Sequence, residues 1–292
     1  MITIEHTAAD LEESGRRLAD RLRDLGSVVV AFSGGVDSSL LAHAALAALG
    51  PDRVLAVTAR SDSLAEGELE HCRTLAESWS LPWTDVETRE LEQPAYVANA
   101  GDRCFWCKDA LMDALVPLAT TRGATVVLGV NLDDLGDHRP GQQAARARGA
   151  SFPMVEAELT KAQIRGLAHR RGLEVWDRPA MPCLASRLPY GTPVQVSLLR
   201  TVDRAETAVR AFGFDDVRVR HYGDTARIEV PAAELPRAAE LAEQLVEALT
   251  TLGFRYVTLD LAGLRSGNLN QALGLRPAAD LSAAAELRPD AQ

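Results

Sequence analysis

A polar turn that follows an apolar run is the first place in the sequence where residue types and spacing suggest chemistry. Residues 33–39 read Ser-Gly-Gly-Val-Asp-Ser-Ser and come directly after the apolar run 28–32. The consecutive Gly34 and Gly35 let the backbone turn sharply and bring N–H groups to an anion, and the helix expected from about Ser38 adds its positive dipole end. The turn therefore predicts a phosphate-binding site.

The donors of this turn differ from those of a Walker-A loop. That motif ends in Gly-Lys-Ser/Thr, whereas no lysine accompanies the glycines here, so we expect no lysine to reach a β- or γ-phosphate. The turn offers the hydroxyls of Ser33, Ser38 and Ser39 and the carboxylate of Asp37. Because Mg²⁺ prefers oxygen ligands and bridges phosphates, this set suits a pyrophosphate leaving group with Mg²⁺ nearby. An ordinary glycine-rich turn between strand and helix is the alternative.

Three of the four cysteines have a spacing typical of a metal centre. Cys104 and Cys107 are three positions apart, so both thiolates can ligate one centre, and Cys183 follows in an irregular stretch. Three thiolates leave an open position on a metal, and open positions are where chemistry occurs. The alternatives are a structural zinc completed by His138 or His221, a redox-active Cys-x-x-Cys pair, and unrelated buried cysteines.

The elements that position these residues alternate between helix and strand. Apolar residues at 11, 18, 22 and 25 recur at helical spacing, and short apolar runs between helical patterns indicate buried strands. We expect helices near 11–25, 38–49, 69–75 and 111–118 and strands near 28–32, 54–57, 85–87 and 126–130. This alternation is typical of an α/β fold, with a parallel sheet covered on both faces. Cys72 falls in a helix and is most simply a small core residue.

A second, smaller domain is expected after the parallel sheet. Thr160 is a predicted N-cap for a helix that runs to Gly172, and the proline-punctuated stretch 177–193 marks the junction. Beyond it we expect helices at 198–212 and 232–249 and strands at 217–220, 226–230 and 256–259, which form an α+β domain with one exposed sheet face. The predicted domains are 1–190 and 191–274, and residues 275–292 are expected to form a flexible tail.

Composition and charge restrict the class of protein. The chain has 292 residues, enough for two domains, and no apolar run long enough to span a membrane. Its start lacks a basic segment followed by an apolar stretch, so we expect a soluble cytoplasmic protein with reduced thiols. The formal net charge of −10 opposes a stable nucleic-acid partner, because neutralisation of phosphates supplies most of that affinity.

The turn at 33–39 also resembles a known motif. Ser-Gly-Gly-Val-Asp-Ser-Ser is similar to the PP-loop of the ATP-pyrophosphatase superfamily, which includes GMP, NAD, asparagine and argininosuccinate synthetases and the tRNA thiolases. This resemblance implies that the protein binds ATP with Mg²⁺ and cleaves it between the α- and β-phosphates.

Five separated motifs resemble one branch of that superfamily, the LarE family of ATP-dependent sulfur transferases, which mature the nickel-pincer nucleotide cofactor of lactate racemase. The motifs are residues 31–41, 102–108, 129–141, 182–187 and 265–270, and they span nearly the whole chain. The resemblance implies that ATP adenylates a carboxylate of pyridinium-3,5-biscarboxylic acid mononucleotide and that sulfur then displaces AMP to leave a thiocarboxylate. AMP is a far better leaving group than oxide, which makes this attack feasible. A homo-oligomer is also implied.

The LarE family divides over the source of its sulfur. Members with a single cysteine at the Cys183 position sacrifice that side chain and end as dehydroalanine, whereas members with three cysteines hold a [4Fe-4S] cluster whose open iron carries an extra sulfide. This chain has the three-cysteine pattern. The resemblance therefore implies a cluster on Cys104, Cys107 and Cys183, catalytic roles for Cys183 and Asp37, and a sulfide donor of unknown identity. Sacrifice of Cys183 is the alternative.

Further residues are weaker candidates for ligand contacts. Several basic residues fall near the junction or in the second domain, where an anionic substrate would need guanidinium partners. Alternating arginines at 218 and 220 equally suit the solvent-facing side of a strand. Glu229 would orient an arginine or contact substrate, with a surface charge as the alternative. The basic set is Arg187, Arg218, Arg220, His221, Arg227 and Arg265.

Three other candidates lie in the first domain. Asp133 follows a buried strand at the carboxyl end of the sheet, where ligands bind, although it could instead cap a helix. Thr58 ends the strand after the turn and is expected beside the adenine. Trp106 stacks on a planar ligand or packs against the protein.

There are three rival functions. GMP or NAD synthetase activity needs ammonia, usually from a glutaminase unit or partner, and would not explain the cysteines. A PP-loop tRNA thiolase also combines this turn with a Cys-x-x-Cys pair and a further cysteine, but its polyanionic substrate favours a basic surface. A non-enzymatic iron-sulfur or zinc module with a degenerate nucleotide site would not retain an intact Ser33-Gly34-Gly35 turn with Asp37 and Ser38.

Overall fold

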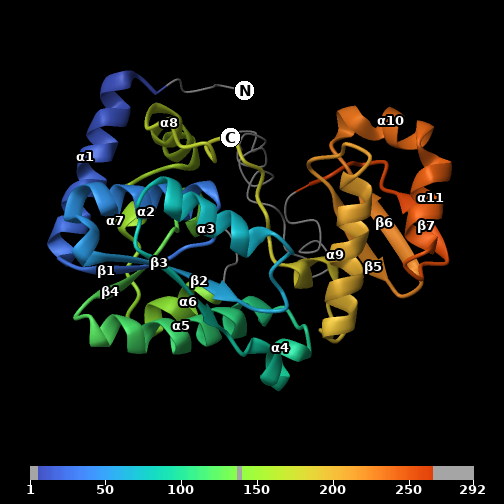
Figure 1. Ribbon diagram of the computed structural model, residues 1–292, viewed down its shortest axis with the longest axis horizontal. Coiled ribbons are helices and arrows are strands. Elements are labelled where there is room, and N and C mark those ends of the chain that lie inside the picture. Colours follow the sequence, from blue (N-terminus) through green and yellow to red (C-terminus); the bar gives the residue numbers. More distant parts are fainter. Residues whose placement is uncertain (1–5, 137–139, 266–292) are drawn as a thin grey trace, which may run out of the picture. The chain divides into compact units, whose positions relative to one another are not determined.

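Two compact units make up the part of the chain that the structure describes. The computed structural model describes residues 6–136 and 140–265. Within these ranges the first unit comprises the residues up to 61, 66–90 and 104–181, and the second comprises 62–65, 91–103 and the residues from 182 onward. Figure 1 shows both units, coloured along the sequence. The tail expected at 275–292 lies outside the described residues.

A four-stranded parallel sheet is the centre of the first unit. The strand order is β3-β2-β1-β4, with β1 at Val28–Ala31, β2 at Val54–Arg60, β3 at Trp83–Glu87 and β4 at Thr125–Leu128. Val28 is in register with Val54 on one side and with Thr125 on the other. The first three residues of β1 are fully buried, as in a strand covered on both faces. The predicted α/β fold with a parallel sheet is confirmed.

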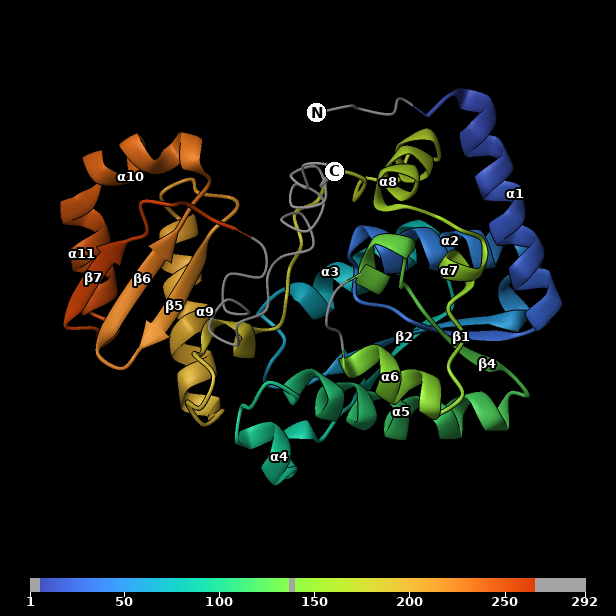
Figure 2. The ribbon, with the colours of Figure 1, turned by 180° about the vertical axis from the view of Figure 1, so that it is seen from behind.

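Helices cover both faces of this sheet (Figures 1 and 2). One layer contains α1, α2, α3, α7 and α8, which bury residues such as Leu18, Leu40 and Ile164 in a common core. The other layer contains α5 and α6, and buries Met112 and Leu115 against Val29. The bounds are α1 Ala8–Leu25, α2 Val36–Leu49, α3 Glu68–Ser78, α5 Arg103–Thr121, α6 Pro140–Ala147, α7 Pro153–Glu156 and α8 Lys161–Arg170.

Local capping and strand pairing set several of these bounds. Thr160 caps α8 in a capping box with Gln163, as predicted. β2 continues to Arg60, beyond the apolar run, because Ala56 to Arg60 pair in register with β3. Helix α5 begins at Arg103 rather than at 111, since no glycine or proline interrupts the intervening residues. Cys104 and Cys107 therefore lie in its first two turns.

The second unit is built on a three-stranded sheet of order β5-β6-β7. β5 spans Arg218–Tyr222 and runs antiparallel to β6 at Thr225–Glu229, while β7 at Tyr256–Leu259 runs parallel to β6. Its core contains Val209, Phe214, Val219, Ile228 and Leu249. The helices are α4 Pro94–Val97, α9 Val196–Arg210, α10 Leu235–Glu240 and α11 Ala242–Thr250. Among the described residues, no helix has the length and apolar character needed to cross a bilayer.

Two expectations for this unit are wrong. The helix predicted at 232–249 is divided into a 3-10 turn at Ala232–Glu234, α10 and α11, because Pro236 opens α10 and Leu241 departs from helical geometry. Arg218 and Arg220 do not lie on a solvent-facing strand surface, since both are at least 93% buried and β5 is covered on both faces.

Candidate active site

The phosphate turn lies at the carboxyl end of β1 and leads directly into α2. Gly34 has a φ of +69°, and a Cβ there would lie 2.9 Å from His71 Cδ2 and 3.0 Å from Cys72 Sγ. Only glycine fits this position. Among the described residues the N–H groups of Gly35, Val36 and Asp37 donate to no protein acceptor, so the turn presents free donors at the positive end of a helix.

The serines of the turn have different positions. Ser33 is exposed, and its N–H donates to Ser38 Oγ at 3.2 Å, while the two hydroxyl oxygens are 3.1 Å apart. Ser38 in turn donates to Gly35 O at 3.1 Å, which closes the turn on itself. Ser39 is fully buried, and its Oγ has no hydrogen-bond partner among the described residues. Ser33 is therefore best placed to contact a ligand, and the phosphate contact expected of Ser39 stays a prediction.

A lysine that sequence analysis missed lies beside the turn. Lys161 Nζ forms an ion pair with Asp37 Oδ2, although the two residues are 124 positions apart. The backbone N–H of Lys161 also donates to Asp133 Oδ2 at 2.5 Å. Sequence analysis found no lysine in the turn to reach a β- or γ-phosphate, whereas the structure places a lysine from the start of α8 beside the turn. The sequence feature that could have indicated Lys161 is its place directly after the helix cap Thr160, in a chain with few lysines.

Asn131 connects the end of β4 to the turn. Its Nδ2 donates to Asp37 Oδ1 at 3.2 Å, and its Oδ1 accepts from the Asp133 N–H at 3.0 Å. Asp133 belongs to a 3-10 turn at Leu132–Gly136. Asp37 and Asp133 are thereby brought to one edge of the sheet with Lys161 between them, an arrangement that can neutralise and orient a phosphate chain.

Thr58, expected beside the adenine, is 2% exposed. Its hydroxyl donates to Phe32 O at 2.8 Å and accepts from Trp83 Nε1 at 2.9 Å. The first bond uses the only hydrogen of the hydroxyl and connects β2 to the end of β1, so the hydroxyl has no hydrogen left to donate to a ligand. The contact of Thr58 with the adenine stays a prediction, and it would have to be made by the backbone of Thr58.

The cysteines fall in three different environments, and none is in a disulfide. Cys104 is exposed and Cys107 is half-buried, both near the start of α5. Cys183 is half-buried and precedes a 3-10 turn at Leu184–Arg187 in the second unit. Cys72 is fully buried, and this burial raises the pKa of its thiol to about 11. Within the described residues no group of three or more His, Cys, Asp or Glu side chains is arranged to hold a metal.

The surroundings of Cys104 and Cys107 are tightly packed on one side. A Cβ on Gly141 of α6 would lie 2.7 Å from the backbone oxygen of Cys104, so the two helices approach closely there. Trp106 contacts Phe105 edge to face, with ring centroids 5.2 Å apart. The stacking of Trp106 on a ligand stays a prediction.

Arg187 holds the chain around Cys183. It is 1% exposed and forms a two-pronged ion pair with the fully buried Glu206, at 2.7 and 3.0 Å. Its Nη1 donates to Pro182 O at 2.6 Å and to Cys183 O at 3.2 Å. Arg220 Nη1 donates to a third carbonyl oxygen of this segment, Ser186 O, at 2.7 Å. Both guanidinium groups, expected to contact substrate, are thus engaged in fixing the Cys183 turn.

The remaining basic candidates also have protein partners or exposed positions. Arg220 and Arg227 both pair with buried Glu229, at 2.8 and 2.7 Å. Burial lowers the pKa of His221, whose ring lies 5.4 Å from that of Phe254. Arg265 is exposed at the end of the described residues. His138, the other zinc-ligand alternative, lies outside them.

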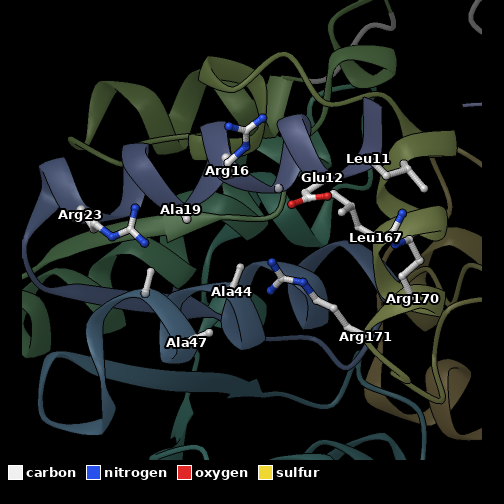
Figure 3. A pocket seen from close by; sticks show the side chains of 12 residues that line it. Leu11, Glu12, Arg16, Ala19, Arg23, Ala44, Ala47, Leu167, Arg170 and Arg171 are labelled. Carbon is white, nitrogen blue, oxygen red and sulfur yellow. The ribbon is translucent and has the colours of Figure 1, made fainter. Parts of the chain in front are cut away.

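A groove of about 450 Å³ lies elsewhere in the first unit, among α1, α2 and α8 (Figure 3). Arginines and small residues line it, including Arg16, Arg23 and Ala44. Arg16 and Arg23 pair with acidic neighbours on the exposed face of α1. None of the predicted site residues lines this groove, so we place the chemistry at the phosphate turn.

Comparison with known proteins shows which families and proteins have a similar sequence. The family model for NAD synthase matches residues 15–101, which include the phosphate turn. The pyridinium-3,5-bisthiocarboxylic acid mononucleotide synthase of Lactiplantibacillus plantarum is 37% identical over 266 residues, 91% of this chain and 96% of that protein. An uncharacterized protein of Synechocystis is 42% identical over 266 residues, 90% of this chain and 99% of that protein.

The similarity to NAD synthetases covers a much smaller part of the chain than the similarity to the Lactiplantibacillus synthase. An NH(3)-dependent NAD(+) synthetase of Methanosarcina mazei is 37% identical over only 90 residues, 28% of this chain and 33% of that protein. The match to the Lactiplantibacillus synthase instead extends through both compact units. The chain therefore belongs to the LarE family of PP-loop enzymes, the family of the Lactiplantibacillus synthase.

Proposed function

We propose that this protein uses ATP to adenylate a carboxylate of pyridinium-3,5-biscarboxylic acid mononucleotide and then replaces a carboxylate oxygen by sulfur. The observation that carries the proposal is the phosphate turn, whose free N–H donors lie beside the Lys161–Asp37 pair. Similarity along nine-tenths of the chain to a synthase of the bisthiocarboxylic acid mononucleotide supports the choice of substrate.

The reaction is balanced without an oxidant or a reductant. A carboxylate oxygen attacks the α-phosphorus of ATP, the bond to the bridging oxygen of the β-phosphate breaks, and pyrophosphate leaves. A sulfur electron pair then attacks the acyl carbon, and the bond from that carbon to the AMP oxygen breaks. The products are a thiocarboxylate, AMP and pyrophosphate.

The residues at the turn suit the first of these steps. Charge develops on the departing pyrophosphate, and the N–H groups of Gly35 and Val36 with the Lys161 ammonium are the cations and dipoles placed to stabilise it. Asp37 orients Lys161 and, with Asp133, supplies the carboxylate oxygens that Mg²⁺ prefers. Asn131 fixes the Asp37 carboxylate in this role.

For the second step we propose that Cys104, Cys107 and Cys183 ligate a [4Fe-4S] cluster. The residues fit this group in one respect: Cys104 and Cys107 are one turn apart at the start of α5, so their thiols lie on the same side of the helix, and Cys104 is exposed. When bound, the cluster supplies a sulfide nucleophile. Direct loss of sulfur from Cys183 is the alternative source, and in either case Arg187 and Arg220 hold the Cys183 turn.

The test is purification without oxygen, followed by measurement of iron and acid-labile sulfide per chain in the wild type, Cys104→Ala and Cys183→Ala. ATP and the biscarboxylic mononucleotide are then added, and AMP, pyrophosphate and the thiocarboxylate are quantified by mass spectrometry. Stoichiometric iron and sulfide that both variants lose, with multiple turnovers, support the proposal. A wild type without iron, whose Cys183 becomes dehydroalanine after one turnover, rejects the cluster and supports the sacrificial route.

The absence of AMP and pyrophosphate in every sample would reject the adenylation step itself. We also propose that the protein is a homo-oligomer in the cytoplasm. Light scattering of the same samples tests the oligomer.

A further inference from the structure

The carbonyl oxygen of Gly34 is held from the side of the turn that faces α3. Arg178 Nη1 donates to this oxygen at 3.2 Å, and His71 Nε2 lies 3.3 Å from it. A carbonyl oxygen has two lone pairs and accepts both donors. His71 donates to this oxygen in the tautomer that carries the proton on Nε2, and burial lowers the pKa of His71, which favours the neutral ring. None of the motifs that predicted the site includes Arg178 or His71.

The guanidinium of Arg178 is itself fixed in place. Its Nη2 donates to Glu68 Oε1 at 2.6 Å, and the two side chains are only 21% and 12% exposed. Glu68 is the first residue of α3, and Arg165 of α8 donates to the backbone oxygen of Arg178 at 3.2 Å. Arg178 therefore bridges two acceptors with separate nitrogens of one rigid plane, which a lysine cannot do.

This bridge determines which way the Gly34–Gly35 peptide faces. In a trans peptide the C=O and N–H groups point to opposite sides, and this peptide is trans. Because Gly34 has no Cβ and a positive φ, its own sterics do not fix the peptide plane. Holding the Gly34 oxygen toward α3 directs the Gly35 N–H to the opposite side of the peptide, where among the described residues it donates to no protein acceptor.

We propose that Arg178 is a positioning residue for the phosphate turn, which orients the Gly35 N–H toward the departing pyrophosphate. This inference rests on the proposed function, since it assigns the open side of the turn to the phosphates of ATP. Arg178 touches neither the reacting atoms nor the ligand in this scheme. It acts through the peptide that it holds, so its removal affects binding of the phosphate chain and leaves binding of the pyridinium nucleotide unchanged.

The test measures binding of inorganic pyrophosphate by calorimetry in the full chain, for the wild type and three variants. Arg178→Ala is expected to weaken pyrophosphate binding about tenfold, the effect of one hydrogen bond to a charged ligand. Arg178→Lys retains the charge beside Glu68 and the melting temperature, but not the pyrophosphate affinity. Arg73→Ala removes ion pairs with Glu70 and Glu77 on the exposed face of α3 and should bind as the wild type.

Steady-state kinetics give a second readout. The KM for ATP should rise in Arg178→Ala, and the KM for the pyridinium nucleotide should not change. Wild-type affinity for pyrophosphate in Arg178→Ala would overturn the inference, as would full recovery by lysine or an equal loss in Arg73→Ala. If the wild type itself binds no pyrophosphate, the proposed function fails, and the inference fails with it; the other outcomes reject the inference alone.

Discussion

Replacement of Gly129 by alanine is expected to push the phosphate turn away from the end of β4. A Cβ on Gly129 would lie 2.8 Å from Ser38 N, 3.0 Å from Asp37 C and 3.1 Å from Ser38 Cα. These are backbone atoms in the first turn of α2, so no side-chain rotation can relieve the overlap. Ordinary contact begins at 3.4 Å, and the strand and the helix must therefore separate by roughly half an ångström.

Two effects of this separation can be estimated. Overpacking of this kind costs about 1–3 kcal/mol of unfolding free energy, which corresponds to a fall in Tm of roughly 2–4 °C for each kcal/mol in a chain of this size. A misplacement of 1 Å near reacting groups costs about 100-fold in rate, so half an ångström at Asp37 and Ser38 should lower the rate of AMP formation roughly tenfold.

Pyrophosphate release and thermal melting check this prediction, with Gly15→Ala as the matched control. Gly15 is buried inside α1, and the nearest neighbour of an added Cβ is a Leu167 methyl carbon at 3.3 Å. That contact can give way, and alanine is favoured over glycine inside a helix by about 1 kcal/mol. If Gly129→Ala and Gly15→Ala have the same rate of pyrophosphate release and the same Tm, the Cβ of residue 129 does not displace the turn.

Three further predictions concern Lys161, Arg187 and Cys72. Lys161→Ala should lower the rate of pyrophosphate release by about 10²–10³ with little change in Tm, because the Lys161–Asp37 pair is partly exposed; an unchanged rate would make it an ordinary surface pair. Arg187→Ala should cost about 3 kcal/mol in urea unfolding, the lower end for a broken buried pair, because the fully buried Glu206 then keeps only the partly exposed Arg210 as an ion-pair partner; a loss below about 1 kcal/mol, the worth of an exposed pair, would contradict this. The folded chain keeps the Cys72 proton between the ordinary pKa of 9.0 and the raised pKa of about 11, whereas the unfolded chain loses it. Stability should therefore fall as pH rises through that interval, and Cys72→Ala should show a smaller fall in urea unfolding experiments.

The fold of the first unit could be predicted from the sequence because its signals are local and agree with one another. The apolar run of β1 followed by two glycines and an apolar helix specifies strand, turn and helix without reference to the rest of the chain. Lys161 could not be found in the same way. Its distance of 124 positions from Asp37 is closed only by the packing of α8 against α2, and the local pattern shows no more than a residue after a helix cap.

The basic residues of the second unit show a different limit of sequence reasoning. The sequence does not distinguish an arginine that binds a ligand from one on a solvent-facing strand or one in a buried ion pair. What separates them is the burial of the acidic partner, and Glu206 and Glu229 are both fully buried. The pairing of Arg187 with Glu206 spans 19 positions and two elements, so it becomes visible only when α9 and the Cys183 turn are in place.

Two short segments from the first part of the chain, 62–65 and 91–103, belong to the second unit, and they decide how the chain can be divided. Asn99, which is fully buried, donates to the carbonyl oxygens of Pro189 and Thr192, at 2.8 and 2.9 Å. Arg103 donates to that of Ala185 at 2.9 Å. A fragment that ends at 181 would carry these donors without their acceptors, and a fragment that begins at 182 would carry the acceptors alone. The two halves are therefore complementary pieces that should associate when supplied as separate polypeptides, and neither is a module that recombination could transfer to another protein by itself.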